Sequence, residues 1–356
     1  MIPVLLPACV LLLLAGLSAQ PPTARDAILA TVIVNPDATY PECHASTVVE
    51  VSPGQFAAAW FGGTKERHPD VGIWFARREE GRWLPAVEVA DGRQEDGRRF
   101  PTWNPVLFAA PGGGLHLFYK VGPSASAWWG MVRESRDGGL TWSAARRLPP
   151  GIIGPVKNKP VVLPDGAWLA GSSTEGNPDG WRLHLEVSRD AGRTWTRVGP
   201  VDKGPGLDAI QPSVLLHPGG LLQALARTRQ GVVAQTWSRD GGATWSMLTA
   251  TELPNPNSGT DAITLADGRH LIVYNHSAHR AGEAKGNRHP LDIAVSRDGL
   301  AWTRVLTLES EPVRSGYAYP AVIQASDGKL HVTYTADRKR IRHVILDPAR
   351  LEGSLR

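Results

Sequence analysis

Cysteine is scarce in this chain of 356 residues, which contains only Cys9 and Cys43. Cys9 lies in an N-terminal apolar segment that we expect to be removed, which leaves Cys43 alone. A single thiol cannot form an internal disulfide, so the sequence excludes a small disulfide-stapled scaffold. The fold must depend on a hydrophobic core, and a chain of this length is long enough to bury one.

The chain also has little excess of charge of one sign. Its formal net charge is +4, and no run of Lys and Arg alternates with aromatic residues, so nucleic-acid binding is not expected. His, Cys and Asp do not cluster at the spacing of metal ligands. We therefore expect no metal and no other cofactor. The 38 Gly and 29 Pro are typical of a globular chain with many turns.

Residues 1–19 form an apolar run that ends in the small residues Ser18 and Ala19. This pattern predicts a signal peptide cleaved after Ala19, hence a secreted or periplasmic protein without stable membrane insertion. No Lys or Arg precedes the run, and an uncleaved membrane anchor is the alternative. Residues 20–356 show no linker or shift in composition. We expect them to form one domain and the protein to be a monomer.

One motif recurs along the chain, with the pattern Ser-Arg-Asp-x-Gly-x-Thr-Trp, here called the Asp box. Its copies occupy residues 135–142, 188–195, 238–245 and, in shortened form, 296–302. They are spaced about 50 to 60 residues apart, which is typical of propeller blades. Residues 76–83 are a degenerate copy. Asp and Gly favour a tight turn and Trp packs between sheets, so each copy predicts a structural hairpin.

A second repeat gives the number of blades. Six short apolar segments each run into a turn glycine and are followed by another strand; they begin at Ser46, Asn104, Asn158, Gln211, Asp261 and Tyr319. Six inner hairpins predict an all-β fold, a six-bladed β-propeller of four-stranded antiparallel blades. We expect the last strand, near residues 341–346, to pair with the N-terminal strand near residues 28–34 and to close the ring.

The starts of the first strands and the ends of the second strands should meet on one face of the channel, opposite the Asp boxes. Basic and amide side chains outnumber carboxylates there, which favours an anionic ligand such as a carboxylated sugar in a glycan or glycoconjugate. The alternative for each residue is that it caps a strand or faces water. The candidate residues on this face are His44, Arg99, Asn104, Lys120, Asn158, Lys159, Gln211, Arg227, Asp261, Asn275, Tyr317, Tyr319 and Arg338.

With its Asp boxes and six-bladed pattern, the chain resembles the sialidase (neuraminidase) superfamily over nearly all of its predicted mature length. This resemblance implies arginines that bind the substrate carboxylate, a tyrosine nucleophile and an aspartate that acts as acid and base. Arg227 resembles the second arginine of the family and Arg288 the third. Tyr319 resembles the nucleophile, with Tyr317 as a competitor close in register. Asp70 resembles the acid/base residue.

Two positions depart from the family pattern. His44 stands where the family has its first arginine, and Gln211 stands where it has the glutamate that assists the tyrosine. Losing one guanidinium removes on the order of 2 kcal/mol of carboxylate binding, and glutamine cannot accept a proton. Three hypotheses remain open: a sialidase-like exo-glycosidase for an acidic or deoxy sugar, a polysaccharide lyase for uronate-containing glycans that uses His44 or Tyr319 as base, and a non-catalytic sugar-binding propeller.

Overall fold

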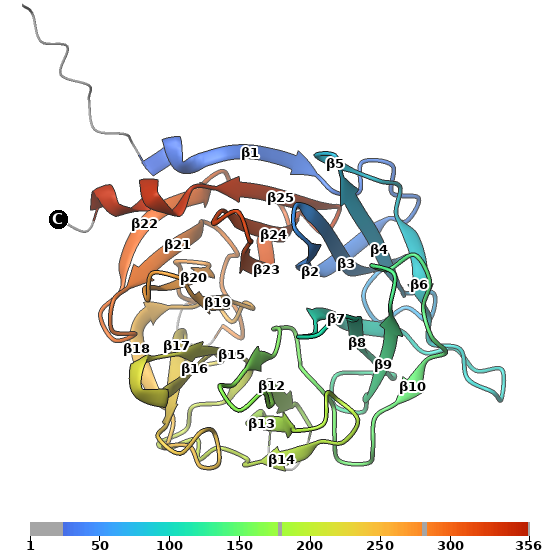
Figure 1. Ribbon diagram of the computed structural model, residues 1–356, viewed down its shortest axis with the longest axis horizontal. Coiled ribbons are helices and arrows are strands. Elements are labelled where there is room, and N and C mark those ends of the chain that lie inside the picture. The colour runs from blue at the N-terminus through green and yellow to red at the C-terminus, as the bar shows by residue number, and fades with distance from the viewer. Residues whose placement is uncertain (1–23, 177–179, 280–282, 355–356) are drawn as a thin grey trace, which may run out of the picture.

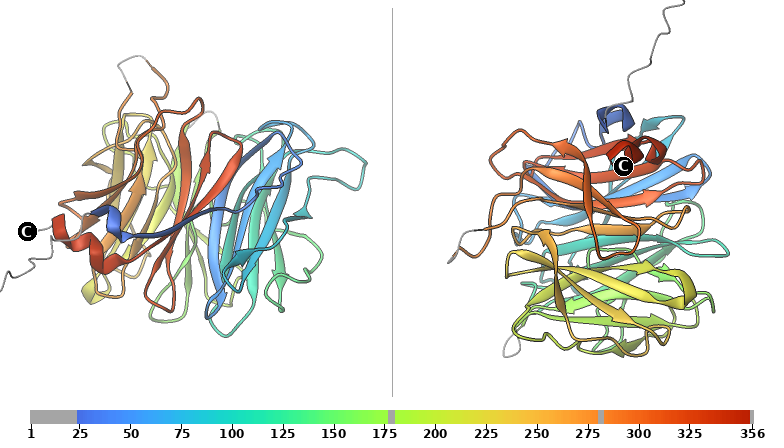
Figure 2. Two further views of the ribbon diagram at one scale, coloured as in Figure 1. Left: turned by 90° about the horizontal axis from the view of Figure 1, so that it is seen from above. Right: turned by 90° about the vertical axis from the view of Figure 1, so that its left-hand side faces the viewer.

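The computed structural model describes residues 24–176, 180–279 and 283–354. The predicted signal peptide, residues 1–19, lies outside the described residues. Six antiparallel sheets are arranged around a central axis, in the order in which they occur along the chain (Figure 1). The predicted all-β, six-bladed propeller is confirmed. Viewed from the side, the strands of each blade cross the thickness of the disc (Figure 2).

The first three blades are built in chain order from the axis outward. Blade 1 consists of β2 (Glu42–Ser52), β3 (Gln55–Gly63), β4 (Gly72–Glu79) and β5 (Arg82–Trp83), with β6 (Val87–Ala90) also pairing with β4. Blade 2 consists of β7 (Thr102–Ala109), β8 (Leu115–Val121), β9 (Trp129–Ser135) and β10 (Arg146–Arg147). Blade 3 consists of β11 (Val161–Val162), β12 (Trp168–Thr174), β13 (Arg182–Ser188) and β14 (Thr196–Val198).

The other three blades complete the ring. Blade 4 consists of β15 (Ala209–Leu216), β16 (Leu222–Thr228), β17 (Val232–Ser238) and β18 (Thr249–Pro254). Blade 5 consists of β19 (Asp261–Thr264), β20 (His270–Tyr274), β21 (Leu291–Ser296) and β22 (Thr303–Glu309). Blade 6 consists of β23 (Tyr317–Gln324), β24 (Leu330–Ala336), β25 (Arg340–Leu346) and β1 (Ile28–Ile33). Three short 3-10 helices are η1 (Ala24–Ala27), η2 (Pro218–Gly220) and η3 (Pro348–Ser354).

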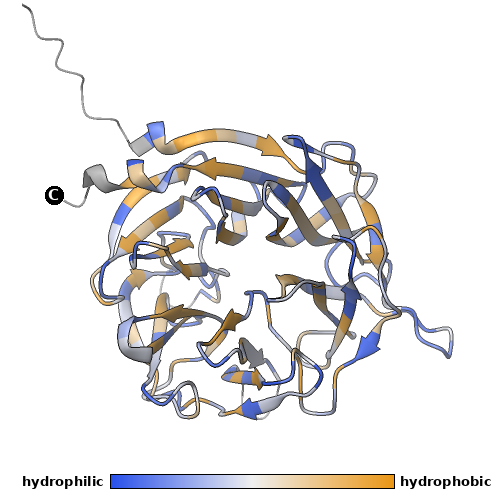
Figure 3. Cartoon of the chain, in the orientation of Figure 1, coloured by the Kyte–Doolittle hydropathy of each residue, from blue (hydrophilic) through white to orange (hydrophobic). Residues whose placement is uncertain are grey.

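The two ends of the chain meet in blade 6. β1 is its outermost strand and pairs with β25, with Val32 opposite His343 (Figure 1). Pairing the N-terminal strand with the last blade satisfies the backbone groups at that sheet edge and joins the ends of the ring. The predicted closure is therefore confirmed. Buried apolar residues fill the spaces between neighbouring sheets, and the hydrophobic segments lie mainly along the strands (Figure 3).

The Asp boxes join the third and fourth strands of their blades, as predicted. In the copy after β9, Ser135 Oγ donates to Asp137 Oδ1 at 2.7 Å, and Thr141 Oγ1 donates to Asp137 Oδ2 at 2.5 Å. These hydrogen bonds favour the ionised carboxylate and lower its pKa to about 2. The same holds for the next two copies; we call Asp137, Asp190 and Asp240 the Asp-box carboxylates. Their role in the structure is to hold turns.

A bulge interrupts the inner strand in at least four blades. The pairing register shifts between His44 and Thr47 and, likewise, between Ile210 and Ser213 and between Ala318 and Ala321. Blade 2 has the corresponding shift between Trp103 and Val106. A residue with positive φ lies at each shift: Ala45, Asn104, Gln211 and Tyr319. A bulge redirects side chains, and two of these residues meet, with Gln211 Nε2 donating to the Tyr319 hydroxyl at 3.3 Å.

Candidate functional site

Tyr319 lies at the centre of the candidate site, at the bulge of β23. Its φ of 53° is a conformation that non-glycine residues rarely adopt. The residue is 9% exposed. Its hydroxyl receives hydrogen bonds from Arg227 Nη1 at 2.8 Å and from Gln211 Nε2 at 3.3 Å. Two donors therefore point at the phenol oxygen, an arrangement that stabilises negative charge on that atom.

Arg227, at the end of β16, is fixed by contacts on both sides of its guanidinium. Nη2 donates to Asn257 Oδ1 at 2.8 Å, and Nη1 also approaches Gln211 Oε1 at 3.3 Å. The guanidinium carbon lies 5.1 Å from the ring centroid of Trp181, within cation–π range. Such contacts orient the guanidinium before any ligand arrives, which lowers the entropic cost of binding an anion.

His44, in β2, is buried next to Tyr319. The ring centroids of the two residues lie 4.2 Å apart, and His44 Nδ1 forms a 3.1 Å hydrogen bond with Thr335 Oγ1. Burial, followed by the charges of Arg338, Arg288, Arg227 and Lys157, lowers the pKa of His44 well below its usual value. The imidazole is therefore neutral at neutral pH. Its buried Nε2 has no hydrogen-bond partner among the described residues, so one ring nitrogen is free for a ligand.

Two further arginines complete a cationic cluster around the tyrosine. The Arg288 guanidinium lies 5.7 Å from the Tyr319 ring centroid. Burial lowers the pKa of Arg288 to about 10, with smaller contributions from Arg227 and Arg338, so it stays charged at neutral pH. Arg338 comes from the β24–β25 turn and forms a 2.7 Å ion pair with Glu66 of the β3–β4 loop. Among the charges acting on His44, that of Arg338 is the strongest.

Lys157 lies beneath the tyrosine and is fully hydrogen-bonded. Its Nζ donates to Asn158 Oδ1 and to the carbonyl of Thr260, both at 2.8 Å, and to the carbonyl of Pro320. Burial lowers its pKa to about 7, although the nearby Asp261 opposes the shift. Three acceptors satisfy all three ammonium protons. Lys157 therefore holds the inner strands together and adds positive charge under the site.

The pKa values of two carboxyl groups, Asp70 and Glu175, are shifted in opposite directions. Burial raises the pKa of Asp70, but hydrogen bonds from Thr64 and His68 outweigh it, and the net shift is downward. Asp70 is thus held as a carboxylate, which is the wrong state for a proton donor. Glu175 follows β12. Burial raises its pKa despite the opposing charges of Arg227 and Arg229, which is the direction that suits a general acid.

The structure brings together only part of the predicted set. His44, Gln211, Arg227 and Arg288 contact or lie beside Tyr319, and the charge of Arg338 acts on His44 and Arg288. Tyr317 packs instead in the core beside Tyr334, with ring centroids 6.2 Å apart. Asp70 and Arg99 contact each other at the rim, where Arg99 Nη2 donates to the carbonyl of Asp70 at 3.1 Å.

Several other predicted residues make structural contacts. Lys120 is fully buried and donates to the carbonyl of Pro155. Asp261 accepts from Lys159, Ser213 and the Val322 backbone. Asn158 donates to the Gln211 carbonyl, Asn275 donates to the carbonyls of Pro290 and Tyr317, and Asn104 is buried at the bulge of β7. These polar groups satisfy backbone and side-chain partners between blades, which is the alternative that the sequence left open.

Some residues of the site were missing from the predicted set. They are Glu66, Asn257, Trp181 and Thr335, which contact the arginines or His44. Three of the four lie in loops, where no sequence period gives their direction. A usable signal existed for the bulges: Asn104, Gln211 and Tyr319 each precede a proline within an inner strand, and proline within a sheet is confined to edges and bulges.

Residues 54–332 match the family model of the BNR repeat-like domain, which is more than half of the chain. The chain belongs to the BNR repeat-like domain family. No curated protein sequence matches this BNR repeat-like protein. The family match agrees with the Asp boxes found in the sequence.

Solved structures with the same fold include sialidases. A protein of unknown function from Dyadobacter fermentans is 18% identical with a TM-score of 0.73, covering 90% of this chain and 98% of that one. The intramolecular trans-sialidase from Ruminococcus gnavus, in complex with oseltamivir carboxylate, is 15% identical with a TM-score of 0.70, covering 91% and 99%. The NanB sialidase from Streptococcus pneumoniae is 12% identical with a TM-score of 0.68, covering 91% and 71%. The TM-scores show a shared fold and, with the family match, support the resemblance to the sialidase superfamily.

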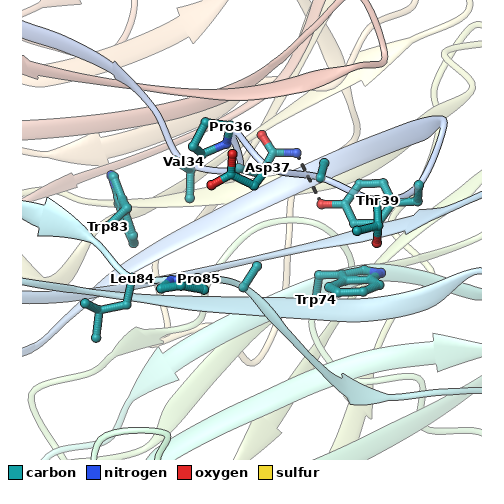
Figure 4. Close-up of a pocket in the computed structure, with 12 residues that line it drawn as sticks. Val34, Pro36, Asp37, Thr39, Trp74, Trp83, Leu84 and Pro85 are labelled. Atoms are coloured by element: carbon teal, nitrogen blue, oxygen red, sulfur yellow. Dashed lines mark hydrogen bonds between the residues drawn. The ribbon is translucent and has the colours of Figure 1, made fainter.

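A separate hollow of about 160 Å³ lies on the outer rim of this BNR repeat-like protein (Figure 4). The segment after β1 and the β5–β6 region line it, with Trp74 and Trp83 on one side and Asp37 on the other. Tyr40 packs on Trp74 with ring centroids 4.7 Å apart. The lining contains one carboxylate and no cationic side chain, so it lacks the charge that distinguishes the channel site.

The described part of the chain contains no group of three or more His, Cys, Asp or Glu side chains that could hold a metal ion. None of its helices is long and apolar enough to cross a membrane.

Proposed function

We propose that the protein is an exported glycosidase that cleaves a glycan at a carboxylate-bearing sugar, with Tyr319 as nucleophile. One observation carries the proposal: the Tyr319 hydroxyl receives hydrogen bonds from Arg227 and Gln211, and Arg288 lies beside the same ring. Arg227 would stabilise the negative charge that forms when the phenol loses its proton and attacks the anomeric carbon. The fold shared with sialidases supports this class of reaction.

Arg288 and Arg338 are suited to bind the sugar carboxylate. The family's first arginine is replaced by His44, and Arg338 exerts the strongest charge effect on that histidine. Arg338 therefore supplies positive charge near the place of the missing guanidinium, although from blade 6. A planar guanidinium fork can form two parallel hydrogen bonds to a carboxylate. An acidic sugar remains the best-suited ligand even though the arginine set differs from that of the family.

Glu175 is the better-suited proton donor for the leaving group. Burial raises its pKa, whereas hydrogen bonds lower the pKa of Asp70. Gln211 orients the phenol but cannot take its proton, and neutral His44, whose ring centroid lies 4.2 Å from that of Tyr319, offers a base beside it. The roles divide into binding by arginines, attack by Tyr319 and proton transfer by Glu175 and His44.

A lyase is the second candidate, and the free Nε2 of His44 favours it. If Nδ1–H donates to Thr335, Nε2 carries the lone pair of the ring. It could then remove the proton at C5 of a uronate. The C5–H electrons would form the C4–C5 double bond as the substituent at C4 leaves, with arginines stabilising the carboxylate in its enolate form.

The test is a panel of acidic glycans incubated with the wild type, Tyr319→Phe and Tyr317→Phe. A glycosidase releases reducing ends without ultraviolet absorbance, whereas a lyase also produces an absorbing unsaturated product. We expect cleavage by the wild type, loss of at least a hundredfold in rate for Tyr319→Phe, and near wild-type rate for Tyr317→Phe, whose ring lies in the core. Equal rates for wild type and Tyr319→Phe would overturn the proposed role of Tyr319.

A further inference from the structure

A basic hollow adjoins the Tyr319 site between blades 5 and 6. It has a volume of about 330 Å³ and is bounded by residues 285–289, residues 313–316 and Arg338. Arg288 and Arg338 line this hollow and also belong to the cationic cluster around Tyr319. Arg288 and Arg338 therefore connect the hollow with the Tyr319 site, and one ligand could contact both.

The side chains that line the basic hollow carry charge of one sign, although Arg338 is also paired with Glu66 outside it. Four cationic side chains line it, Lys285, Arg288, Arg314 and Arg338, together with His289, and no Asp or Glu is among the lining residues. Lys285 and Arg314 are exposed, and neither forms an ion pair or a side-chain hydrogen bond with another described residue. Like charges held close together repel each other, and a bound anion relieves that repulsion.

The walls of the basic hollow are fixed by hydrogen bonds that do not use these cationic groups. The Tyr317 backbone donates to the Arg288 carbonyl at 2.7 Å, and the Ser315 backbone donates to Asp337 Oδ1 at 2.8 Å. Gly316 has a φ of 70°, and a Cβ there would lie 2.6 Å from Arg288 Cβ. Glycine thus allows the two loops to approach closely. The hollow is formed before a ligand binds, as small-molecule sites usually are.

We propose that the basic hollow binds a second anionic group of the same glycan, a carboxylate or a sulfate, while the first acid group lies at the Tyr319 site. The proposal rests on the proposed function, because the first group is the carboxylate bound beside Tyr319. Since Arg288 and Arg338 border both spaces, the two acid groups must be close together on one molecule. The substrate is then a glycan with neighbouring acid groups and not one with a single terminal acidic sugar.

The test compares the affinity of probes with one and with two acid groups. The probes are a monomeric uronic acid, a disaccharide of two uronic acids, and a uronic acid that carries one sulfate ester, measured by calorimetry at low salt. The variant is Arg314→Ser with Lys285→Ser. Its control is Arg136→Ser with Arg239→Ser, which removes the same charge from two exposed arginines in the Asp boxes on the opposite face. Thermal unfolding checks that both variants are folded.

We expect the ratio of two-charge to one-charge affinity to fall about tenfold in the hollow variant and to stay unchanged in the control. The disaccharide and the sulfated probe separate the two sources of the second charge. An unchanged ratio in the hollow variant, an equal fall in the control, or no measurable binding of either two-charge probe would overturn the proposal. If the ratio falls as expected but no glycan is cleaved, binding of a second anionic group in the basic hollow is supported and the proposed glycosidase function is wrong.

Discussion

Replacing Arg227 by methionine tests the most highly connected group of the site. The substitution keeps most of the side-chain volume and removes the 2.8 Å hydrogen bond to the Tyr319 hydroxyl together with one positive charge. A hydrogen bond to a charged group contributes about 2 kcal/mol. If Arg227 also contacts the substrate carboxylate, a second loss of about 2 kcal/mol follows. Their sum, about 4 kcal/mol, corresponds to a fall in kcat/KM of roughly a thousandfold.

The assay is steady-state hydrolysis of the best glycan from the acidic panel, with kcat and KM measured separately. Loss of stabilisation of the phenol oxygen should lower kcat, and loss of carboxylate binding should raise KM. Arg229→Met is the matched control, because Arg229 stacks on Trp181 at 4.4 Å without contacting Tyr319. A value of kcat/KM for Arg227→Met within twofold of the wild type, or an equal loss in the control, would refute the assignment.

Three further predictions concern geometry and pH. Gly316→Ala should displace Arg288, because the new Cβ would lie 2.6 Å from the Cβ of Arg288. We expect kcat/KM to fall about tenfold. A crystal structure of the variant with Arg288 unmoved would contradict this prediction. Burial and nearby positive charges lower the pKa of His44 well below 6.5, so protonation is disfavoured in the folded state and the free energy of unfolding falls as the pH drops below 6.5. Measured by urea unfolding between pH 6.5 and 5, this fall should be smaller for His44→Gln. An identical fall would count against the prediction. The Asp-box carboxylates have pKa values of about 2, so they stabilise the folded state fully above about pH 4, and this contribution is lost as the pH falls through 2. The midpoint of thermal unfolding should therefore depend less on pH between 4 and 2 in the triple Asp→Asn variant than in the wild type.

The number and order of the blades could be predicted because their signals are periodic. The Asp boxes mark the turn between the third and fourth strands, and the inner hairpins carry apolar runs that end at a turn glycine. Both patterns depend on local backbone preferences and on burial, which the sequence expresses directly. Counting the six inner hairpins also placed His44, Gln211, Arg227 and Tyr319 on one face of the channel.

The sequence could not show which of Tyr317 and Tyr319 faces the channel. Residues two apart in a regular strand point to the same face, so both tyrosines were expected at the channel. The register shift between Ala318 and Ala321 separates them, and Tyr317 turns into the core. A bulge of this kind changes direction without changing the apolar pattern.

Contacts between loops of different blades could not be predicted either. The ion pair between Arg338 and Glu66 joins two turns that are far apart in the sequence and adjacent in the ring. Similarly, Lys120 stood at a strand end that the pattern assigned to the channel, but the neighbouring blade covers it. The packing of adjacent blades decides whether a polar group at a strand end meets a ligand or a carbonyl.

The most direct test of the central claim is to trap the glycan on the protein. The wild type would be incubated with a fluorinated glycosyl fluoride of the acidic sugar that it cleaves, a reagent that slows breakdown of a glycosyl-enzyme intermediate, and then mapped by peptide mass spectrometry. If Tyr319 is the nucleophile, one added sugar mass appears on the peptide that contains Tyr319 and none in Tyr319→Phe. A label on another residue, or cleavage at the wild-type rate by Tyr319→Phe, would contradict it.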